Sequence, residues 1–305
     1  MSQESLFMTD GRRVERGENR RWGAEQRLEF IELRAFWDGS LNRADIRAQF
    51  GVSAPQASAD IATYLDLAPG NLVYDGSKKR YVAAADFAPR LVRPSAEAYL
   101  GELVERTCAP EARATWFGFV PNFATTPIPG RSVDVDVLRK VVIATREQMS
   151  IEILYQSMSP NRPLPQHRRI TPHALASDRL RWHVRAFCHE AGSFKDFILS
   201  RVREVGSPGA AGTAGIRDED WNTEVGVTLI PNPDLSPDQQ RAVDWDYAMG
   251  GEGRLELTVR RALLYYLRQR LRLDVPSDRP AERPIVLENA TEFEAAINLA
   301  KGAAG

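Results

Sequence analysis

The sequence has no run of about 18 apolar residues, the length that marks a membrane-spanning helix. Its N-terminus is polar and charged and lacks the apolar segment of a signal peptide. Only two cysteines occur, Cys108 and Cys188, so we expect no disulfide framework and no paired-cysteine metal knuckle, and a reducing cytoplasm fits. Of the 305 residues, 43% are hydrophobic and 27% are charged, as in globular proteins. At roughly 100–200 residues per domain, the chain has room for two or three domains.

The net charge of the chain is only −1, but it is unevenly distributed. Residues 1–90 have a net charge of 0, residues 91–216 of +4, and residues 217–305 of −5. A polyanion is therefore drawn to the middle third, or to local patches of the first third.

Residues 20–92 have the pattern of a winged helix-turn-helix. A helix from about Trp22 precedes a short helix from about Asn42, and Gly51 and Ser53 mark a tight turn before a third helix. The third helix opens with the S-x-x-Q pattern of a capping box and has a proline in its first turn. An Asp-Gly dipeptide between two short apolar strands then predicts a hairpin. This order favours a DNA-binding domain, and a generic small helical domain is the alternative.

The first residues of a recognition helix reach base edges, and a basic wing contacts phosphates. The residues expected to contact DNA therefore lie at the starts of the second and third helices and at the hairpin: Asn42, Arg43, Ser53, Pro55, Gln56, Ser58, Lys78, Lys79 and Arg80.

Residues 134–206 change to short strands. A helix near residues 134–146 is followed by four expected strands, at residues 151–155, 168–175, 181–188 and 196–202. Short strands separated by turn residues favour a small β-barrel or half-barrel. In the third strand, alternation places Trp182 on the apolar face and sends His183 and Arg185 together to the other.

Basic residues are concentrated in this region. All four histidines lie between residues 167 and 189, and eight arginines lie between residues 162 and 203, which with Lys195 gives a local charge excess of +6. The arginine fork suits phosphate, and histidine offers a donor or a stacking plane. The cluster favours an anionic ligand, either a nucleotide or a short single strand, and a solvated basic surface is the alternative.

The remaining segments have no chemical motif. Residues 1–19 are expected to be a disordered lead-in, and residues 93–133, which contain several prolines, a linker with some helix. Gly206–Gly215 has the composition of a flexible linker. Residues 207–305 read as a small α+β domain whose apolar faces we expect to make a dimer contact; these faces comprise Leu255, Leu257 and Val259 on a strand, and Leu263, Leu267 and Leu271 on a helix.

Patterns of catalytic and metal sites are lacking. The sequence contains no G-x-S-x-G, no P-loop and no H-E-x-x-H. The histidines do not have a zinc-ligand spacing with Cys188, which falls on the apolar face of its strand as a structural cysteine does. We therefore expect no enzyme activity, no metal and no cofactor.

Three segments carry a family resemblance: Arg168–Leu175, Arg181–Ala186 and Phe197–Val202. They resemble the WYL domain of bacterial transcriptional regulators, and the W-Y-L motif stands here as Trp182-His183-Val184. This form resembles the branch of phage-defence regulators called CapW and BrxR.

The resemblance implies an α+β protein with three domains: an N-terminal winged helix-turn-helix, a central Sm-like β-barrel over residues 134–206, and a C-terminal dimerisation domain over residues 207–305. It implies a homodimeric repressor of a phage-defence operon that binds an inverted-repeat operator and releases it when the barrel binds an anionic ligand. The expected ligand-binding residues come from four strands: Tyr155, Arg168, His173, His183, Arg185, Ser200 and Arg201. An activator in a DNA-damage response and a nucleic-acid-processing enzyme that uses the Arg/His cluster are the alternatives.

Overall fold

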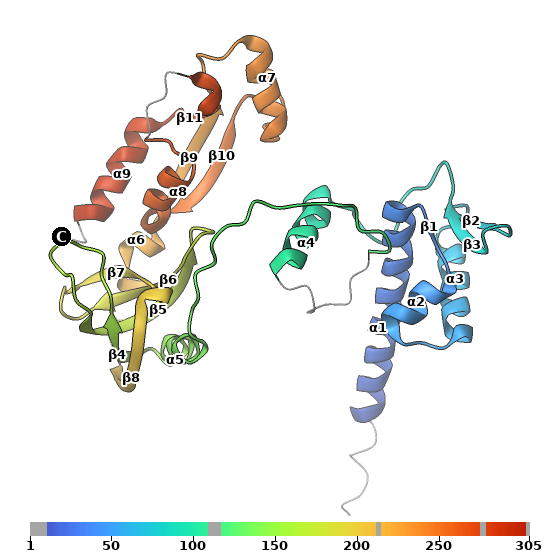
Figure 1. The fold of residues 1–305 in the computed structure, drawn as a ribbon, viewed down its shortest axis with the longest axis horizontal. Coiled ribbons are helices and arrows are strands. Elements are labelled where there is room, and N and C mark those ends of the chain that lie inside the picture. The colour runs from blue at the N-terminus through green and yellow to red at the C-terminus, as the bar shows by residue number, and fades with distance from the viewer. Residues whose placement is uncertain (1–10, 109–116, 212–214, 275–278, 303–305) are drawn as a thin grey trace, which may run out of the picture. The chain divides into compact units, whose positions relative to one another are not determined.

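A computed structural model describes residues 11–108, 117–211, 215–274 and 279–302, and the chain divides into two compact units, residues 1–127 and residues 128–305 (Figure 1). Within the described ranges, no helix is both long and apolar enough to cross a membrane. The elements of the first unit are α1 (Gly11–Asp38), β1 (Ser40–Leu41), α2 (Arg43–Phe50), α3 (Ala54–Leu67), β2 (Leu72–Asp75), β3 (Arg80–Ala83) and α4 (Ala96–Cys108).

Helices α1, α2 and α3 share one hydrophobic core. Ile31, Ile46 and Ile61, one from each helix, are all at most 1% exposed. Strands β2 and β3 form the expected hairpin, and β1 completes a three-stranded sheet in the order β1-β3-β2. The first unit is therefore a winged helix-turn-helix, as predicted.

Hydrogen bonds from side chains fix where α2 and α3 begin. Asn42 Oδ1 accepts hydrogen bonds from two backbone N–H groups of α2. The Asp45 carboxylate accepts one from the backbone N–H of Asn42, which completes the capping box. Ser53 Oγ caps α3 by accepting a hydrogen bond from the backbone N–H of Gln56 at 3.3 Å. The box expected at α3 is only half formed, because the Gln56 side chain donates instead to Asp60 Oδ1 at 2.9 Å.

The first helix starts earlier than expected. α1 begins at Gly11, inside the predicted lead-in of residues 1–19, whose first ten residues lie outside the described ranges. Arginine and glutamate, frequent in this segment, have high helix propensity. A lack of apolar residues argues against burial of a segment but does not prevent it from forming a helix.

Part of the expected linker packs back on the first helix. In α4, Leu103 is buried and the Tyr99 ring lies 4.4 Å from the Trp37 ring, between ring centroids. Beyond α4, the Asp38 carboxylate accepts hydrogen bonds from the backbone amides of residues 118 and 119, at 2.9 and 3.3 Å. Residues 96–108 and 117–119 are therefore attached to the winged helix.

One buried carboxylate ties the recognition helix to the segment that leaves the wing. Glu32 on α1 is fully buried. Its carboxylate accepts a hydrogen bond from Tyr64 Oη on α3 at 3.0 Å, and three more from the backbone amides of residues 90, 91 and 92 at 2.9, 2.6 and 2.8 Å. Because each of these donors would otherwise be left unpaired, Glu32 holds α1, α3 and the exit segment in one arrangement.

The second unit contains a five-stranded antiparallel sheet and a smaller three-stranded sheet. Its elements are α5 (Val135–Arg146), β4 (Met149–Tyr155), β5 (Gln166–Ser177), β6 (Trp182–Cys188), β7 (Ser193–Ile198), η1 (Leu199–Arg201), β8 (Val202–Ala211), η2 (Gly215–Arg217), α6 (Glu219–Asn222), β9 (Glu224–Pro231), α7 (Pro237–Asp246), β10 (Leu255–Arg260), η3 (Arg261–Leu263), α8 (Leu264–Arg270), η4 (Pro280–Glu282), β11 (Ile285–Leu287) and α9 (Ala290–Gly302).

The larger sheet has the strand order β7-β6-β5-β4-β8, and α5 packs on one of its faces. Val137 and Val141 of α5 share a core with Ile153, Val184 and Ala186 of the sheet. Among the described strands, β7 and β8 remain the two edges, so the sheet is an open half-barrel.

The fourth expected strand, residues 196–202, is confirmed only for residues 196–198, and its end is wrong. β7 ends at Ile198, a 3-10 turn follows, and β8 runs from Val202 to Ala211. The predicted flexible linker therefore begins with strand residues that pair with β4. The glycines of this segment were mistaken for signs of flexibility. At Gly209, an added Cβ atom would lie 2.7 Å from Ser150 Oγ, so a glycine is required there by close packing between strands.

The C-terminal domain is a sheet in the order β10-β9-β11 with a separate core. Val227, Leu229 and Phe293 are among its buried residues. Five of the six apolar residues expected to make the dimer contact are partly buried against this core: Leu255, Leu257, Val259, Leu267 and Leu271. The domain therefore covers part of this apolar face itself, and a dimer contact through it stays a prediction.

We predict that Glu32→Ala lowers the stability of the winged helix strongly. The substitution leaves buried donors without an acceptor, at about 1–3 kcal/mol for each group that stays unpaired. Glu29→Ala on the same helix is the control, because Glu29 is exposed and such changes usually stay within about 0.5 kcal/mol. Thermal denaturation measures both variants, and equal melting temperatures would refute the role given to Glu32.

Candidate functional site

The outer face of α3 is built from small and polar side chains. Ala57, Asp60, Ile61 and Tyr64 are buried. The opposite face exposes Pro55, Gln56, Ala59, Ala62 and Thr63. Small side chains allow a helix to approach closely to the surface it binds. The outward positions Ala59, Ala62 and Thr63 were not among the predicted DNA contacts, although helical periodicity from Ala57 would have identified them.

Several predicted DNA contacts are engaged within the domain. Asn42 and Ser53 are helix caps, and Gln56 donates to Asp60 through Nε2, which leaves its Oε1 as an acceptor. Ser58 Oγ donates to a backbone carbonyl of α3 and accepts a hydrogen bond from Arg43 Nη1 at 3.3 Å. The Arg43 guanidinium therefore lies beside the first turns of α3.

No lysine or arginine lies on α3, which carries two aspartates. The positive charge near it comes from neighbouring elements. Arg43 and Arg47 are exposed on α2, and Lys78 and Lys79 are exposed at the tip of the hairpin. Arg47 was not among the DNA contacts predicted from the sequence. Its position in the last turn of the short helix that precedes α3 is the signal that could have identified it.

The tip of the wing is closed by Asp75. Its carboxylate accepts hydrogen bonds from Ser77 Oγ and from the amides of Ser77 and Lys78, which holds the pKa of this carboxyl below its usual value. Lys79 has a φ of 52°, the left-handed conformation of a tight turn. The turn therefore presents Lys78 and Lys79 outward, whereas Arg80 is half-buried in β3.

In the second unit, the seven predicted ligand-binding residues fall into two groups. The first group lies at one end of the sheet: Tyr155, Arg168, Ser200 and Arg201. Tyr155 pairs with Val202, and the Arg201 carbonyl accepts a hydrogen bond from the Gln156 amide at 3.1 Å. The second group, His173, His183 and Arg185, faces the C-terminal domain. The expected convergence of all seven on one face is wrong, because Tyr155 packs with the core under α5 and the second group lies across the sheet from it.

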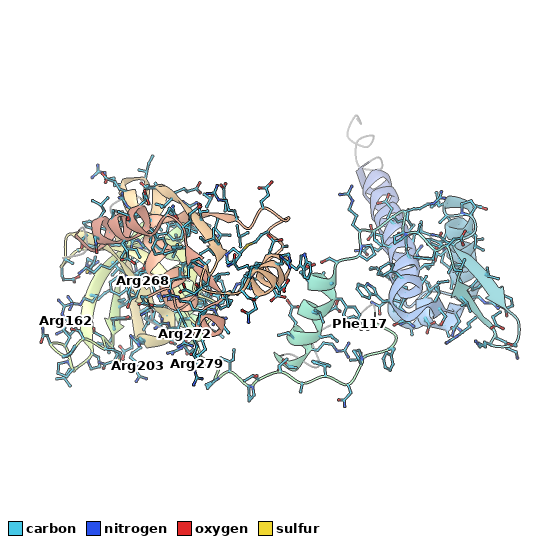
Figure 2. The ribbon with its side chains drawn as sticks, turned by 90° about the horizontal axis from the view of Figure 1, so that it is seen from above. Phe117, Arg162, Arg203, Arg268, Arg272 and Arg279 are labelled. Carbon is cyan, nitrogen blue, oxygen red and sulfur yellow. The ribbon has the colours of Figure 1, made fainter. Side chains whose placement is uncertain are left out.

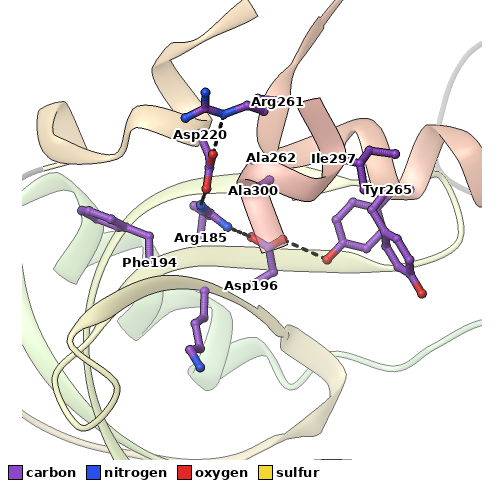
Figure 3. A pocket seen from close by; sticks show the side chains of 11 residues that line it. Arg185, Phe194, Asp196, Asp220, Arg261, Ala262, Tyr265, Ile297 and Ala300 are labelled. Atoms are coloured by element: carbon purple, nitrogen blue, oxygen red, sulfur yellow. Dashed lines mark hydrogen bonds and ion pairs between the residues drawn. The ribbon is translucent and has the colours of Figure 1, made fainter. Parts of the chain in front are cut away.

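Arg185 is the centre of a buried ionic network (Figure 3). Its guanidinium donates two hydrogen bonds to Asp218, at 2.7 and 3.0 Å, and one to Asp196 at 3.3 Å. Asp220 lies 3.6 Å from Arg185 Nη2 and accepts a hydrogen bond from Arg261 at 2.6 Å. Asp218 and Asp220 flank the start of α6, so the network joins the sheet to the C-terminal domain.

Electrostatics keep these groups ionised. Burial alone raises the pKa of the Asp218 carboxyl, but hydrogen bonds from His173 and Arg185 outweigh burial and hold its pKa well below the usual range. Burial likewise opposes the charged form of Arg185, and the aspartates outweigh it and raise the pKa of the guanidinium. The arginine that was predicted to bind an external anion thus already binds the protein's own carboxylates.

His183 lies beside this network and is 2% exposed. Its ring is 4.7 Å from the Tyr266 ring, and Tyr266 Oη donates to Asp196 at 2.9 Å. Neither ring nitrogen of His183 has a hydrogen-bond partner among the described residues, and desolvation lowers the pKa of the imidazole. Trp182, expected on the apolar face, is 55% exposed, which corrects that prediction. β6 is buried on both faces from His183 onward, so alternation in its sequence did not separate core from surface.

A cavity of about 310 Å³ adjoins the network between β6, β7 and the C-terminal domain. Arg185 and Asp196 line one side, and Arg261, Tyr265 and Tyr266 line the other. The cavity therefore touches both domains of the second unit.

The first group is more open. Arg201 makes no side-chain hydrogen bond or ion pair to any described residue, and Ser200 is half-buried beside it. Arg203, two residues after Arg201, and Arg162, between Tyr155 and Arg168 in the sequence, are both exposed (Figure 2). Tyr155 Oη accepts a hydrogen bond from the Ile198 amide at 3.2 Å. These guanidinium groups, and not Arg185, are available to an anion.

Cys188 is buried in the core under α5, where desolvation raises the pKa of its thiol. This placement fits the structural role expected for it. In the part of the chain that the structure describes, no group of three or more His, Cys, Asp or Glu side chains is arranged to hold a metal ion.

Comparison with known proteins bears out the three domains. Residues 23–105 match the family described as BrxR transcriptional regulator winged helix-turn-helix domain, residues 136–206 match the WYL domain, and residues 224–293 match the BrxR transcriptional regulator C-terminal dimerization domain. The DNA-binding transcriptional repressor CapW of Stenotrophomonas maltophilia is 40% identical over 278 residues, which cover 90% of this chain and 92% of that protein. This chain belongs to the CapW family.

Two further CapW proteins, both described as DNA-binding transcriptional repressors, are similar over most of their length. That of Escherichia coli strain KTE188 is 38% identical over 91% of this chain and 93% of its own. That of Pseudomonas aeruginosa is 38% identical over 94% of this chain and 96% of its own. This CapW-family protein is therefore a DNA-binding transcriptional repressor with a dimerisation domain, a class in which the relatives are named as regulators and not as enzymes.

We predict that Arg185→Ala destabilises the second unit of this CapW-family protein by about 3–5 kcal/mol, because it leaves buried carboxylates without their counter-charge. Arg203→Ala is the matched control, since Arg203 is exposed and its side chain makes no hydrogen bond or ion pair with the described residues. Denaturant unfolding measures both, and a shift of the same size in the two variants would argue against the network.

The network also predicts a dependence of stability on pH. The pKa of Asp218 is lowered by folding, so its contribution is present above the ordinary carboxyl pKa of about 4 and is lost as the pH falls below it. The difference in unfolding free energy between the wild type and Asp218→Asn should shrink from pH 6 to pH 3. A difference that stays constant over this range would contradict the assignment.

Proposed function

We propose that this protein represses a phage-defence operon by binding an inverted-repeat operator as a homodimer, and that an anionic ligand at the WYL domain releases it. The ligand would be a nucleotide or single-stranded nucleic acid. The observation that carries the proposal is the winged helix, in which a small-residue face of α3 is flanked by basic side chains on α2 and on the wing tip.

The division of labour in this domain supports a specific operator. Phosphate contacts supply most of the affinity, and base contacts supply the sequence preference. Arg43, Lys78 and Lys79 are placed for phosphates, and Gln56 Oε1 remains a free acceptor for the amino group of a base. Thr63 and Ala59 offer methyl groups for contact with thymine.

The homodimer is supported by the match of residues 224–293 to a dimerisation domain. One winged helix covers only a short half-site, and specific DNA affinity usually needs a larger contact. Two copies related by a two-fold axis would read two half-sites of an inverted repeat.

Arg201 supports the ligand part of the proposal. A half-buried arginine without an internal partner among the described residues can bind an anion with its donor fork. Tyr155, across the β4–β8 pairing, supplies an aromatic ring near it. A ligand can release the protein only by binding the released state more tightly than the DNA-binding state. A variant that tests the ligand site must therefore lose ligand binding and keep repression.

We expect Lys78→Ala with Lys79→Ala to weaken binding to all DNA sequences alike. The slope of log K against log salt should flatten by about 0.9 for each phosphate that the variant no longer neutralises. Gln56→Ala is the comparator: it should leave that slope unchanged and reduce discrimination at one base pair by about 1–3 kcal/mol. Fluorescence anisotropy on the upstream region of the protein's own operon, at several salt concentrations, measures both variants. The prediction for the wing fails when the double variant keeps the wild-type slope.

Arg201→Ala should repress normally and resist induction in a reporter strain challenged with phage. The structural alternative, that Arg201 holds the sheet through a buried carboxylate, predicts a lower melting temperature and an absence of repression instead. No described carboxylate contacts Arg201, so we expect an unchanged melting temperature. Normal induction of Arg201→Ala would remove Arg201 from the ligand site.

A further inference from the structure

The outer face of α7 exposes a tryptophan. Asp238, Arg241, Ala242 and Trp245 follow one another at helical spacing and are all exposed, whereas Val243 and Asp244 on the inner face are buried. Trp245 is 76% exposed. An exposed indole ring is costly in water, and tryptophan is one of the residue types enriched at the hot spots of protein–protein interfaces.

The tryptophan sits on a rigid support. Ser236 and Gln239 form a complete capping box at the start of α7. At its end, the buried Asp244 carboxylate accepts hydrogen bonds from the amides of Gly251 and Gly253, each at 2.9 Å. These contacts fix the rotation of the helix, so Trp245 points outward because of the fold and not because of a frayed end.

Other exposed aromatic groups of the domain are less prominent. In the described part of residues 224–293, Tyr247 is 36% exposed and Tyr265 is 40% exposed. Tyr265 lines the cavity beside Arg185, and its hydroxyl accepts a hydrogen bond from Gln269. The side chain of Trp245 makes no hydrogen bond or ring contact with a described residue. Its exposed ring is therefore available to contact the surface of a partner.

We infer that α7 is the anchor of the dimer contact and that it packs against α7 of a second copy of this chain. The inference rests on the homodimer of the proposed function. The match to a dimerisation domain, residues 224–293, spans all of α7, so the occupant that fits this face is a second copy of the chain. A two-fold axis brings the same face of both copies together, so that face must be complementary to itself.

The α7 face meets this condition in shape. Trp245 and Ala242 lie one turn apart, so in an antiparallel pair of helices each large ring faces the small side chain of the other copy. Asp238 and Arg241 pair with each other within one chain, so this pair leaves no net charge on the face. A surface for an unrelated partner would not need this self-complementarity.

Area arithmetic gives Trp245 its place in the contact. A tryptophan buries about 150–250 Å², whereas a stable interface buries about 800 Å² on each partner. Trp245 is therefore a central anchor around which neighbouring surface closes. Anchors of this type change the dissociation constant of a dimer by about 30-fold or more when truncated.

The test is sedimentation equilibrium of the full-length protein as wild type, Trp245→Ala and Leu299→Ala. Leu299 on α9 is 64% exposed and is the matched control for removal of an exposed apolar side chain in the same domain. We expect the dimer dissociation constant to rise about 30-fold or more for Trp245→Ala and to stay unchanged for Leu299→Ala, with equal melting temperatures. A wild-type constant for Trp245→Ala overturns the inference and leaves the homodimer intact.

Cysteine cross-linking adds a positive result that does not depend on weakened binding. Ala242→Cys lies near, but not opposite, Ala242→Cys of the other copy, so a short bismaleimide should cross-link the two thiols, and Leu299→Cys should not cross-link. Failure of Ala242→Cys to cross-link in a dimeric sample also overturns the inference. A wild-type protein that is monomeric at all concentrations would instead overturn the homodimer itself, and a gel shift on the operator region reports DNA binding separately.

Discussion

The buried guanidinium of Arg185 holds the second unit together. It donates hydrogen bonds to two carboxylates, Asp196 on the next strand and Asp218 at the start of α6. The neighbouring Asp220 accepts a hydrogen bond from Arg261 of the C-terminal domain. A buried charge is tolerated only when its partners compensate the loss of water, so all of these groups depend on one another. The network therefore joins the WYL sheet directly to the dimerisation domain.

This arrangement changes which arginines can sense an anion. A guanidinium whose charge is already compensated by buried carboxylates gains little from a further anion, whereas one without partners loses only water on binding. Arg185 belongs to the first kind and Arg201 to the second, although both stand in the same basic segment of the sequence. In the proposed function, the ligand therefore binds at the Arg201 end of the sheet, and the Arg185 end is structural.

Local patterns predicted most of the elements, and long-range contacts account for the errors. The cap Ser53 and the hairpin at Asp75 lie within a few residues of the elements they control, so neighbouring residues were sufficient to predict them. His183 was placed on a solvent-facing surface because the side chain that covers it, Tyr266, lies more than eighty residues later in the chain. The same reason hid the core contacts of the C-terminal leucines. Alternation along a strand reports that two faces differ, but it does not say what covers either of them.

The carboxylate of Glu32 has a consequence for how this domain can diversify. Three of its four donors are main-chain amides, at residues 90, 91 and 92. Every amino acid except proline supplies such an amide, so the attachment of the exit segment is indifferent to the side chains there. Evolution is free to change the surface of that segment, for instance in charge, without loosening it from the recognition helix. Only Glu32 on α1 must supply a particular side-chain group, the carboxylate. Residues 90, 91 and 92 need to supply only a backbone N–H.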